Sequence, residues 1–194
     1  MKIRSVIIPI AALAAIISIQ ATSSLKGKDR VNLTTDSDSI SQSKKLSDEI
    51  RRKAALHVEG NRIMNAEGAA LTLNGISTGD MEEIDARGKW NALYFSRMRE
   101  WGANVVRITV VPRSWSFGKR EKTLELIASG VEWARRNGMY TIIDWHAVGS
   151  LKDGIYEKGF ETTMNETLDF WSAVSSRLKD EPYAPFCEIF SEPA

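Results

Sequence analysis

The stretch GMYTIIDWH, Gly138–His146, decides the fold because it contains the end of a helix, a strand, and polar groups at the tip of that strand. Asn137 and Gly138 are a typical C-terminal cap for the helix that precedes them. The run MYTIIDW that follows is mostly apolar and has the length of a strand. Asp144 and His146 come at its end. A strand of this kind, entered from a helix, is typical of a parallel sheet covered by helices.

The same succession continues on both sides of this segment. On the N-terminal side, NVVRITV is an apolar strand with Arg107 inside it, and a helix over residues 91–101 precedes it. Between the two strands, apolar residues recur at helical spacing at Leu124, Ile127, Ala128, Val131 and Ala134. On the C-terminal side, Thr163 and Glu166 form a capping box that opens a third helix. Its predicted buried stripe is Met164, Leu168, Trp171, Val174 and Leu178. FCEIF is the last predicted strand.

The segment before these elements predicts a small β-hairpin. Turn signals occur at Gly60-Asn61 and at Glu67-Gly68. A stronger strand then follows through Leu71, Leu73 and Ile76 and ends with NGIS.

The predicted order is a hairpin and then four strands that alternate with three helices. With right-handed crossovers, this order gives either a doubly wound sheet or a (β/α) barrel. No strand is followed by a glycine-rich phosphate loop such as G-x-G-x-x-G. Polar side chains gather instead at the C-terminal ends of the strands, at Arg107, Thr109, Asp144, His146, Ser191 and Glu192. Because this clustering is typical of the TIM barrel, we predict an α/β fold with about the first four βα units of a (β/α)₈ barrel.

The composition excludes several classes of protein. The net charge is +1 and charged residues make up 26% of the chain, which gives no basic excess for binding nucleic acid. Cys187 is the only cysteine, so the chain can form no internal disulfide and no metal cluster of the usual Cys/His spacing. Its apolar neighbours predict that Cys187 is a small buried hydrophobic residue.

The N-terminal region differs in character from the rest. Residues 1–23 combine a basic start, an apolar run and small residues, which predicts a secretory signal peptide or an uncleaved membrane anchor. Residues 24–54 are rich in Ser, Thr, Asp and Lys and predict a flexible polar linker. The folded domain is expected over residues 55–194. Either reading of the first segment predicts a secreted or extracytoplasmic protein that contacts a membrane only through that segment.

Four motifs, LNGIS, GANVVRITV, GMYTIIDWH and CEIFSEP, occur in this order on consecutive predicted strands. Together they closely resemble family 5 of the glycoside hydrolases, the cellulase-type retaining enzymes, over about residues 55–194. The resemblance implies a TIM barrel that hydrolyses O-glycosidic bonds in a polysaccharide of the β-glucan class, with no metal and no organic cofactor. It leaves cellulose, mixed-linkage glucan, xyloglucan and mannan open as substrates.

Glu192 and Arg107 are the main site candidates. Pro193 holds Glu192 in extended backbone at the tip of the last strand, and the resemblance implies that Glu192 is the general acid/base. A guanidinium inside an apolar strand requires a carboxylate partner. That partner is either a nearby acid in a structural ion pair or the nucleophile that the matching arginine orients in the family. Asp144 shares a strand face with His146. It could pair with Arg107 or hold His146.

Three further residues are candidates for binding or supporting a substrate. His146 is either a structural hydrogen bonder or, as the resemblance favours, a partner of a sugar hydroxyl next to the scissile bond. Ser191 stands where the family usually has an asparagine that binds the sugar 2-hydroxyl. Trp115 follows the second strand and is the best of six tryptophans for a sugar-stacking platform.

The second carboxylate of the family lies on the seventh strand, and this chain reaches the fourth. Retaining hydrolysis needs two carboxyl groups about 5 Å apart. We therefore expect a truncated product or incomplete record of a longer enzyme, with little or no activity by itself. The alternative is a non-catalytic, membrane-anchored half-barrel that binds carbohydrate.

Overall fold

The computed structural model describes residues 35–115 and 118–193, so the predicted signal or anchor at residues 1–23 lies outside the described residues. The chain divides into two compact units, residues 1–42 and 43–194, and the second contains the domain discussed below. The α-helices are α1 (Thr35–Ala54), α2 (Met81–Ala86), α3 (Ala92–Glu100), α4 (Arg120–Arg136) and α5 (Met164–Leu178). The strands are β1 (His57–Glu59), β2 (Arg62–Met64), β3 (Gly75–Asp80), β4 (Val105–Val110), β5 (Tyr140–Trp145), β6 (Val148–Ser150), β7 (Ile155–Tyr156), β8 (Phe186–Glu188) and β9 (Glu192–Pro193).

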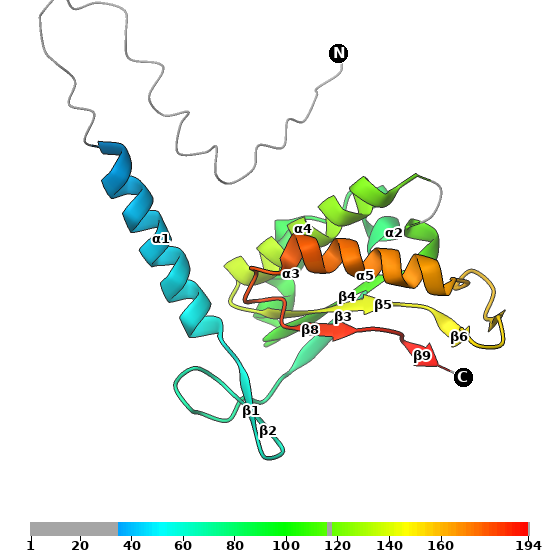
Figure 1. Cartoon of the computed structure of the whole chain (residues 1–194), viewed down its shortest axis with the longest axis horizontal. Coiled ribbons are helices and arrows are strands. Elements are labelled where there is room, and N and C mark those ends of the chain that lie inside the picture. Colours follow the sequence, from blue (N-terminus) through cyan, green and yellow to red (C-terminus); the bar gives the residue numbers. More distant parts are fainter. Residues whose placement is uncertain (1–34, 116–117, 194) are drawn as a thin grey trace, which may run out of the picture. The chain divides into compact units, whose positions relative to one another are not determined.

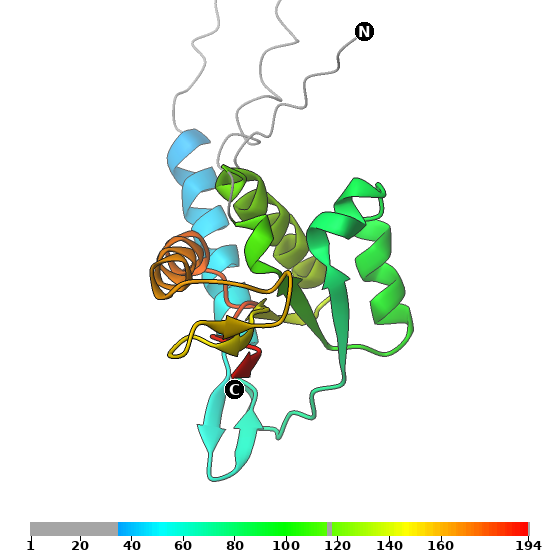
Figure 2. The ribbon, with the colours of Figure 1, turned by 90° about the vertical axis from the view of Figure 1, so that its right-hand side faces the viewer.

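A four-stranded parallel sheet in the order β3-β4-β5-β8 forms the centre of the domain. Helices α2 to α5 cover one face of this sheet (Figure 1). Figure 2 shows α3, α4 and α5 as neighbours in that order. Helices α3, α4 and α5 each return the chain to the start of the next strand of this sheet, which is the repeating unit of a β/α barrel. The predicted α/β architecture is confirmed, and the central sheet has four parallel strands.

The two faces of the sheet differ because side chains alternate along each strand. The helix-covered face is apolar and contains most of the core, including Val106, Ile108, Val110, Ile143 and Trp145. Arg107, Asp144 and Glu188 belong to the opposite face, as the register of β4, β5 and β8 shows. The packing of the helices therefore leaves the polar face of the strands free to build a site.

The strand predicted through Leu71 and Leu73 begins later than expected. β3 starts at Gly75, where pairing with β4 begins, and continues to Asp80. Before that point the Asn104 side chain makes hydrogen bonds to the backbone of residues 72–74 in place of strand pairing. Its Nδ2 donates to the Thr72 carbonyl over 2.8 Å, and its Oδ1 accepts from Asn74 N over 2.7 Å. A side-chain amide that substitutes for strand pairing leaves no signal in local periodicity.

The region expected as a flexible polar linker is helical over Thr35–Ala54, which the sequence analysis did not predict. The Lys53–Glu49 pair, with 2.8 Å between Nζ and Oε1, is the i,i+4 contact that supports a polar helix. Ala54 at its end is buried in a small cluster with Val105 and Tyr140, at the start of β4 and β5. The predicted hairpin is confirmed as β1 and β2, with Gly60 in the left-handed region at φ 59°.

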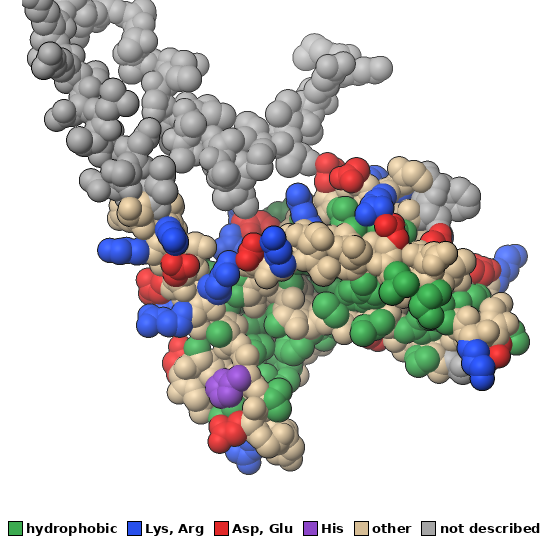
Figure 3. All heavy atoms as spheres, in the orientation of Figure 1, with side chains coloured by type: hydrophobic (Ala, Val, Ile, Leu, Met, Phe, Trp, Pro, Cys, Tyr) green, Lys and Arg blue, Asp and Glu red, His purple; other side chains and the backbone are tan. Residues whose placement is uncertain are grey.

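Several predicted burial patterns are wrong at the edge of the domain. On α5 the buried residues are Thr167, Phe170 and Val174, whereas Met164 and Leu168 are exposed. Ile189 and Cys187 are exposed as well, the latter against the prediction of a buried thiol. β8 is the outer strand of the sheet. Among the described residues, no further strand of this sheet lies next to it to cover the apolar side chains of β8 and of the adjacent segments. Figure 3 shows hydrophobic side chains on the surface along this side.

The close contact between α4 and the sheet depends on Gly130. A methyl group at this position would lie 2.7 Å from the Trp90 ring and 3.1 Å from Ile108. We expect Gly130→Ala to lower the free energy of unfolding by about 1–2 kcal/mol, because overpacking outweighs the gain in helix propensity. Urea unfolding monitored by circular dichroism measures this effect. Glu125→Ala, at an exposed position of the same helix, is the control and should change stability little.

Candidate active site

Arg107 is the centre of the polar network on the open face of the sheet. Its Nε lies 2.6 Å from Glu188 Oε2 and its Nη2 lies 2.8 Å from Glu188 Oε1, which is a bidentate pair. Nη2 also lies 3.1 Å from Asp144 Oδ2 and donates to Ser191 Oγ over 3.2 Å. The hydrogen bonds to Glu188 raise the pKa of Arg107 and lower the pKa of Glu188, so this pair is ionised. The predicted carboxylate partner of Arg107 is therefore Glu188, supported by Asp144.

Asp144 connects Arg107 to His146. Its side chain is fully buried, and Oδ2 lies 2.9 Å from His146 Nδ1. Oδ1 has no hydrogen-bond partner among the described residues. Burial raises the pKa of Asp144 to about 6, although the positive charge of Arg107 opposes this shift. The buried carboxylate thus holds two side chains of the site at once.

The raised pKa of Asp144 makes domain stability depend on pH. The folded-state pKa of about 6 exceeds the ordinary aspartate value of 3.8, so the folded domain binds more protons than the unfolded chain between these values. The stabilising contribution is therefore complete below about pH 4 and is lost as the pH rises through 6. We expect the unfolding free energy of the wild type, minus that of Asp144→Asn, to fall from pH 4 to pH 7.

Urea unfolding at a series of pH values measures this difference. The comparison is repeated in a His146→Gln background to remove the contribution of the imidazole. A difference that stays constant or rises across the window would contradict the prediction.

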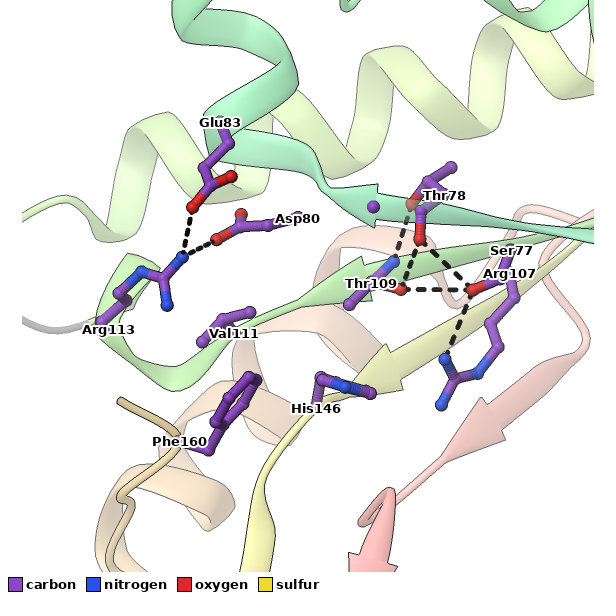
Figure 4. Close-up of a pocket in the computed structure, with 11 residues that line it drawn as sticks. Ser77, Thr78, Asp80, Glu83, Arg107, Thr109, Val111, Arg113, His146 and Phe160 are labelled. Carbon is purple, nitrogen blue, oxygen red and sulfur yellow. Dashed lines mark hydrogen bonds and ion pairs between the residues drawn. The ribbon is translucent and has the colours of Figure 1, made fainter. Parts of the chain in front are cut away.

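A pocket of about 470 Å³ opens at the C-terminal ends of β3, β4 and β5 (Figure 4). Arg107 and His146 line it together with the hydroxyl residues Ser77, Thr78 and Thr109. The remaining lining residues are Gly79, Asp80, Glu83, Val111, Arg113 and Phe160. The volume falls within the range of small-molecule sites. Because Asp144 contacts Nδ1 of His146, Nε2 is the ring nitrogen available to a ligand.

Glu192 follows Ser191 at the same end of the sheet. β9, which contains Glu192, pairs with β6, and Glu192 N donates to the Ala147 carbonyl over 3.3 Å. The side chain is exposed, and its charge is one of those that raise the pKa of Arg107. The structure thus brings Arg107, His146 and Ser191 into one region, with Glu192 beside it and outside the pocket lining.

Trp115 is not a sugar platform, so this prediction is wrong. The side chain is 6% exposed and packs edge-on against Phe170, with 5.1 Å between ring centroids. Its Nε1 donates to Asp169 Oδ2 over 3.0 Å. The 3₁₀ turn η3 (Pro112–Ser114) precedes Trp115, and the ring packs against α5 in the core that the helices cover.

Sequence reasoning missed other members of the pocket. Asp80, Glu83 and Arg113 form an ion-paired cluster, in which Arg113 Nη2 lies 3.0 Å from Glu83 Oε1 and also contacts Asp80. Glu188 was detectable, because it is a charge in an apolar strand just as Arg107 is. Phe160 lies in the loop over residues 147–161, and no local signal separates it from other loop aromatics. Within the described ranges, no group of three His, Cys, Asp or Glu side chains is arranged to hold a metal ion.

Comparison with known proteins agrees with this geometry. Residues 64–194 match the family model for cellulase, glycosyl hydrolase family 5. Endoglucanase C of Evansella cellulosilytica is 27% identical over 137 residues, which are 68% of this chain and 16% of that protein. Endoglucanase A of Butyrivibrio fibrisolvens is 29% identical over 150 residues, which are 71% of this chain and 32% of that protein. None of the helices in the described part of the chain is long and apolar enough to cross a membrane.

Solved structures give the same result. A β-glucanase of Saccharophagus degradans superposes with a TM-score of 0.68 at 31% identity, covering 71% of this chain and 42% of that protein. The same β-glucanase has been solved in complex with cellotetraose. This chain therefore spans less than half the length of these relatives. Since the matched region contains all four strands of the central sheet and the whole Arg107 network, the chain belongs to the cellulase family, glycosyl hydrolase family 5.

Proposed function

We propose that this chain is the N-terminal part of a secreted retaining endo-β-glucanase, with Glu192 as its general acid/base. The observation that carries the proposal is the convergence of Arg107, His146 and Ser191 beside Glu192, at the C-terminal ends of parallel strands. In TIM-barrel enzymes, this end of the barrel contains the active site. The names of the relatives as endoglucanases and the cellotetraose complex of one of them support a β-glucan substrate.

Each residue has a defined part in this proposal. Glu192 donates a proton to the leaving glycosidic oxygen and later removes a proton from the incoming water. Nε2 of His146 contacts a hydroxyl of the sugar beside the scissile bond. Ser191 Oγ, held by Arg107, takes the place of the family asparagine toward the sugar 2-hydroxyl. Its shorter side chain reaches less far, so a bridging water is expected there.

The proposal also covers the 194-residue chain by itself. The retaining reaction needs a second carboxyl group about 5 Å from the first, and in the family this group lies on a later strand. We therefore expect the chain to bind soluble β-glucan without measurable turnover. Residues 1–23, as a signal peptide or anchor, direct it out of the cytoplasm.

Two measurements test this proposal on the chain itself. Isothermal titration calorimetry with cellotetraose should detect binding, and a reducing-sugar assay on barley β-glucan should detect no release. Failure to bind any soluble β-glucan at millimolar concentration would contradict the proposal. Clear turnover would instead show that a carboxylate of this chain acts as the nucleophile, and loss of that turnover in Glu188→Gln would identify it.

A further inference from the structure

The strand that contains Glu192 belongs to a small three-stranded sheet outside the central one, in the order β7-β6-β9. β6 pairs in parallel with β9, so that Val148 lies opposite Glu192 and Gly149 lies opposite Pro193. Figure 1 shows β6 and β9 next to each other, beyond the ends of β5 and β8. Because the side chain of Glu192 is exposed, packing holds it little, and its position depends on this backbone pairing.

The pairing of β6 with β9 continues the register of the central sheet. Asp144 in β5 lies opposite Glu188 in β8, and Val148 in β6 lies opposite Glu192 in β9. In both pairs a residue meets the one 44 positions later in the chain, so the register is the same before and after the interruption. The start of the loop over residues 147–161 therefore extends the sheet as far as Glu192.

Ala147 connects this extension to the core. Its side chain is fully buried, and its carbonyl accepts from Glu192 N over 3.3 Å. Its own N donates to the Trp145 carbonyl over 2.8 Å, and this turn leads the chain from β5 into β6. Trp145 is fully buried and stacks on Phe170, with 4.3 Å between ring centroids. The hydrogen bond from Glu192 N thus ends on a residue that the core holds in place.

Gly149 is the position where the three strands come closest together. It lies in the middle strand, opposite Tyr156 of β7 and Pro193 of β9, and its φ is 138°. A Cβ at this position would overlap the carbonyl oxygen of Ile155 and would lie 2.7 Å from the Cα of Tyr156. Both are backbone atoms, which cannot rotate away as the end of a side chain can. Glycine is the residue that allows such a close approach of two backbones.

We propose that Gly149 is a positioning residue for Glu192. Its missing side chain lets β7 pack closely on β6, and β6 in this place is the template that fixes the backbone of β9. This assignment rests on the proposed general acid/base role of Glu192 and adds the segment that holds its carboxyl group at the glycosidic oxygen. A larger residue at position 149 displaces β6, and β9 moves with it.

Amide hydrogen exchange of the 194-residue chain, followed by NMR, tests the pairing itself. In the wild type the amide of Glu192 should exchange at least tenfold more slowly than an unstructured amide. Gly149→Ala should bring its exchange to the unstructured rate and leave the amides of β5 unchanged, which shows that the domain is folded. A Glu192 amide that exchanges at the unstructured rate in the wild type would overturn the proposal without any variant.

Gly154→Ala is the matched control for the exchange measurement. Gly154 lies in the same hairpin and also has a positive φ, at 66°, but a Cβ placed there meets nothing within 4 Å. This substitution therefore strains the turn without displacing β6, and exchange at Glu192 should stay within twofold of the wild type. Equal effects of the two substitutions would overturn the assignment to Gly149.

The catalytic consequence is measured in a completed barrel, in which residues 43–193 are joined to the C-terminal part of the S. degradans β-glucanase. Gly149→Ala should lower kcat on β-glucan about 10–100-fold and change KM less than about twofold, because a misplaced acid slows the reaction without removing sugar contacts. A dinitrophenyl cellobioside needs no proton donor, so the first cleavage of its glycosidic bond should slow less than threefold. Equal slowing on both substrates, or an unchanged kcat on β-glucan, would overturn the positioning role.

The variant Glu192→Gln in the same barrel separates this proposal from the proposed function. If Glu192→Gln lowers the rate on β-glucan and Gly149→Ala does not, the positioning role alone is overturned. If Glu192→Gln leaves the rate unchanged, the general acid/base role fails, and the positioning role of Gly149 fails with it.

Discussion

Replacing Glu192 with glutamine is expected to lower the rate of β-glucan hydrolysis by 10²–10⁴-fold, because the amide cannot donate or accept the catalytic proton. The measurement uses a completed barrel, in which residues 43–193 are joined to the C-terminal part of the S. degradans β-glucanase. That protein is 31% identical to this chain over the region they share. Glu157→Gln is the matched control, since Glu157 is an exposed glutamate on the nearby loop and should leave the rate unchanged.

The leaving group separates acid catalysis from a structural role of Glu192. An aryl cellobioside with a dinitrophenolate leaving group needs no protonation to break its glycosidic bond. Glu192→Gln should therefore slow cleavage of the glycosidic bond, the first step of the reaction, much less on this substrate than on β-glucan. An equal decrease in the rate of bond cleavage on both substrates would contradict the general acid role of Glu192.

The second large effect concerns stability. We expect Glu188→Ala to lower the free energy of unfolding by about 2 kcal/mol, because Arg107 loses a bidentate partner at a partly buried position. The side chains of the pair are 24% and 31% exposed. Arg107 keeps Asp144 and Ser191, so the loss stays below that of a fully buried charge without any partner.

The Arg97–Glu100 pair on α3 is the control for this comparison. Its nitrogen-to-oxygen distance is 2.7 Å, close to that of Arg107 and Glu188, but both side chains are more than half exposed. Arg97→Ala should therefore cost less than about 1 kcal/mol, as is usual for surface ion pairs. Urea unfolding of both variants measures the difference. Equal losses would show that burial does not strengthen the Arg107 network.

The family and the strand order could be predicted from particular residues. Asn137-Gly138 and the Thr163–Glu166 capping box mark helix ends, and both are present in the structure. A carboxylate partner for Arg107 was also predictable, because a charge in an apolar strand requires one. The helix ends depend on residues within a few positions of one another. The partner of Arg107 follows from the high free-energy cost of burying a charge without a counter-charge.

Other expectations failed because they depended on contacts that are distant in the sequence. Trp115 followed a strand at the expected place, but the turn before it sends the ring into the core against Phe170. Met164 and Leu168 have helical spacing, yet the position of α5 at the edge of the sheet leaves them exposed. Helical periodicity shows which residues share a face, and only the packing of the domain shows which part of that face is covered.

By itself, the sequence determined a chain of parallel strands and helices, the end of the strands where polar groups gather, and the family. Local periodicity, capping and motif spacing are enough for these conclusions. The tertiary structure decided that Arg107 pairs with Glu188, that Asp144 holds both Arg107 and His146, and that Phe160 lines the pocket whereas Trp115 does not. These outcomes depend on the register between strands and on the path of a loop, where residues up to 81 positions apart come into contact.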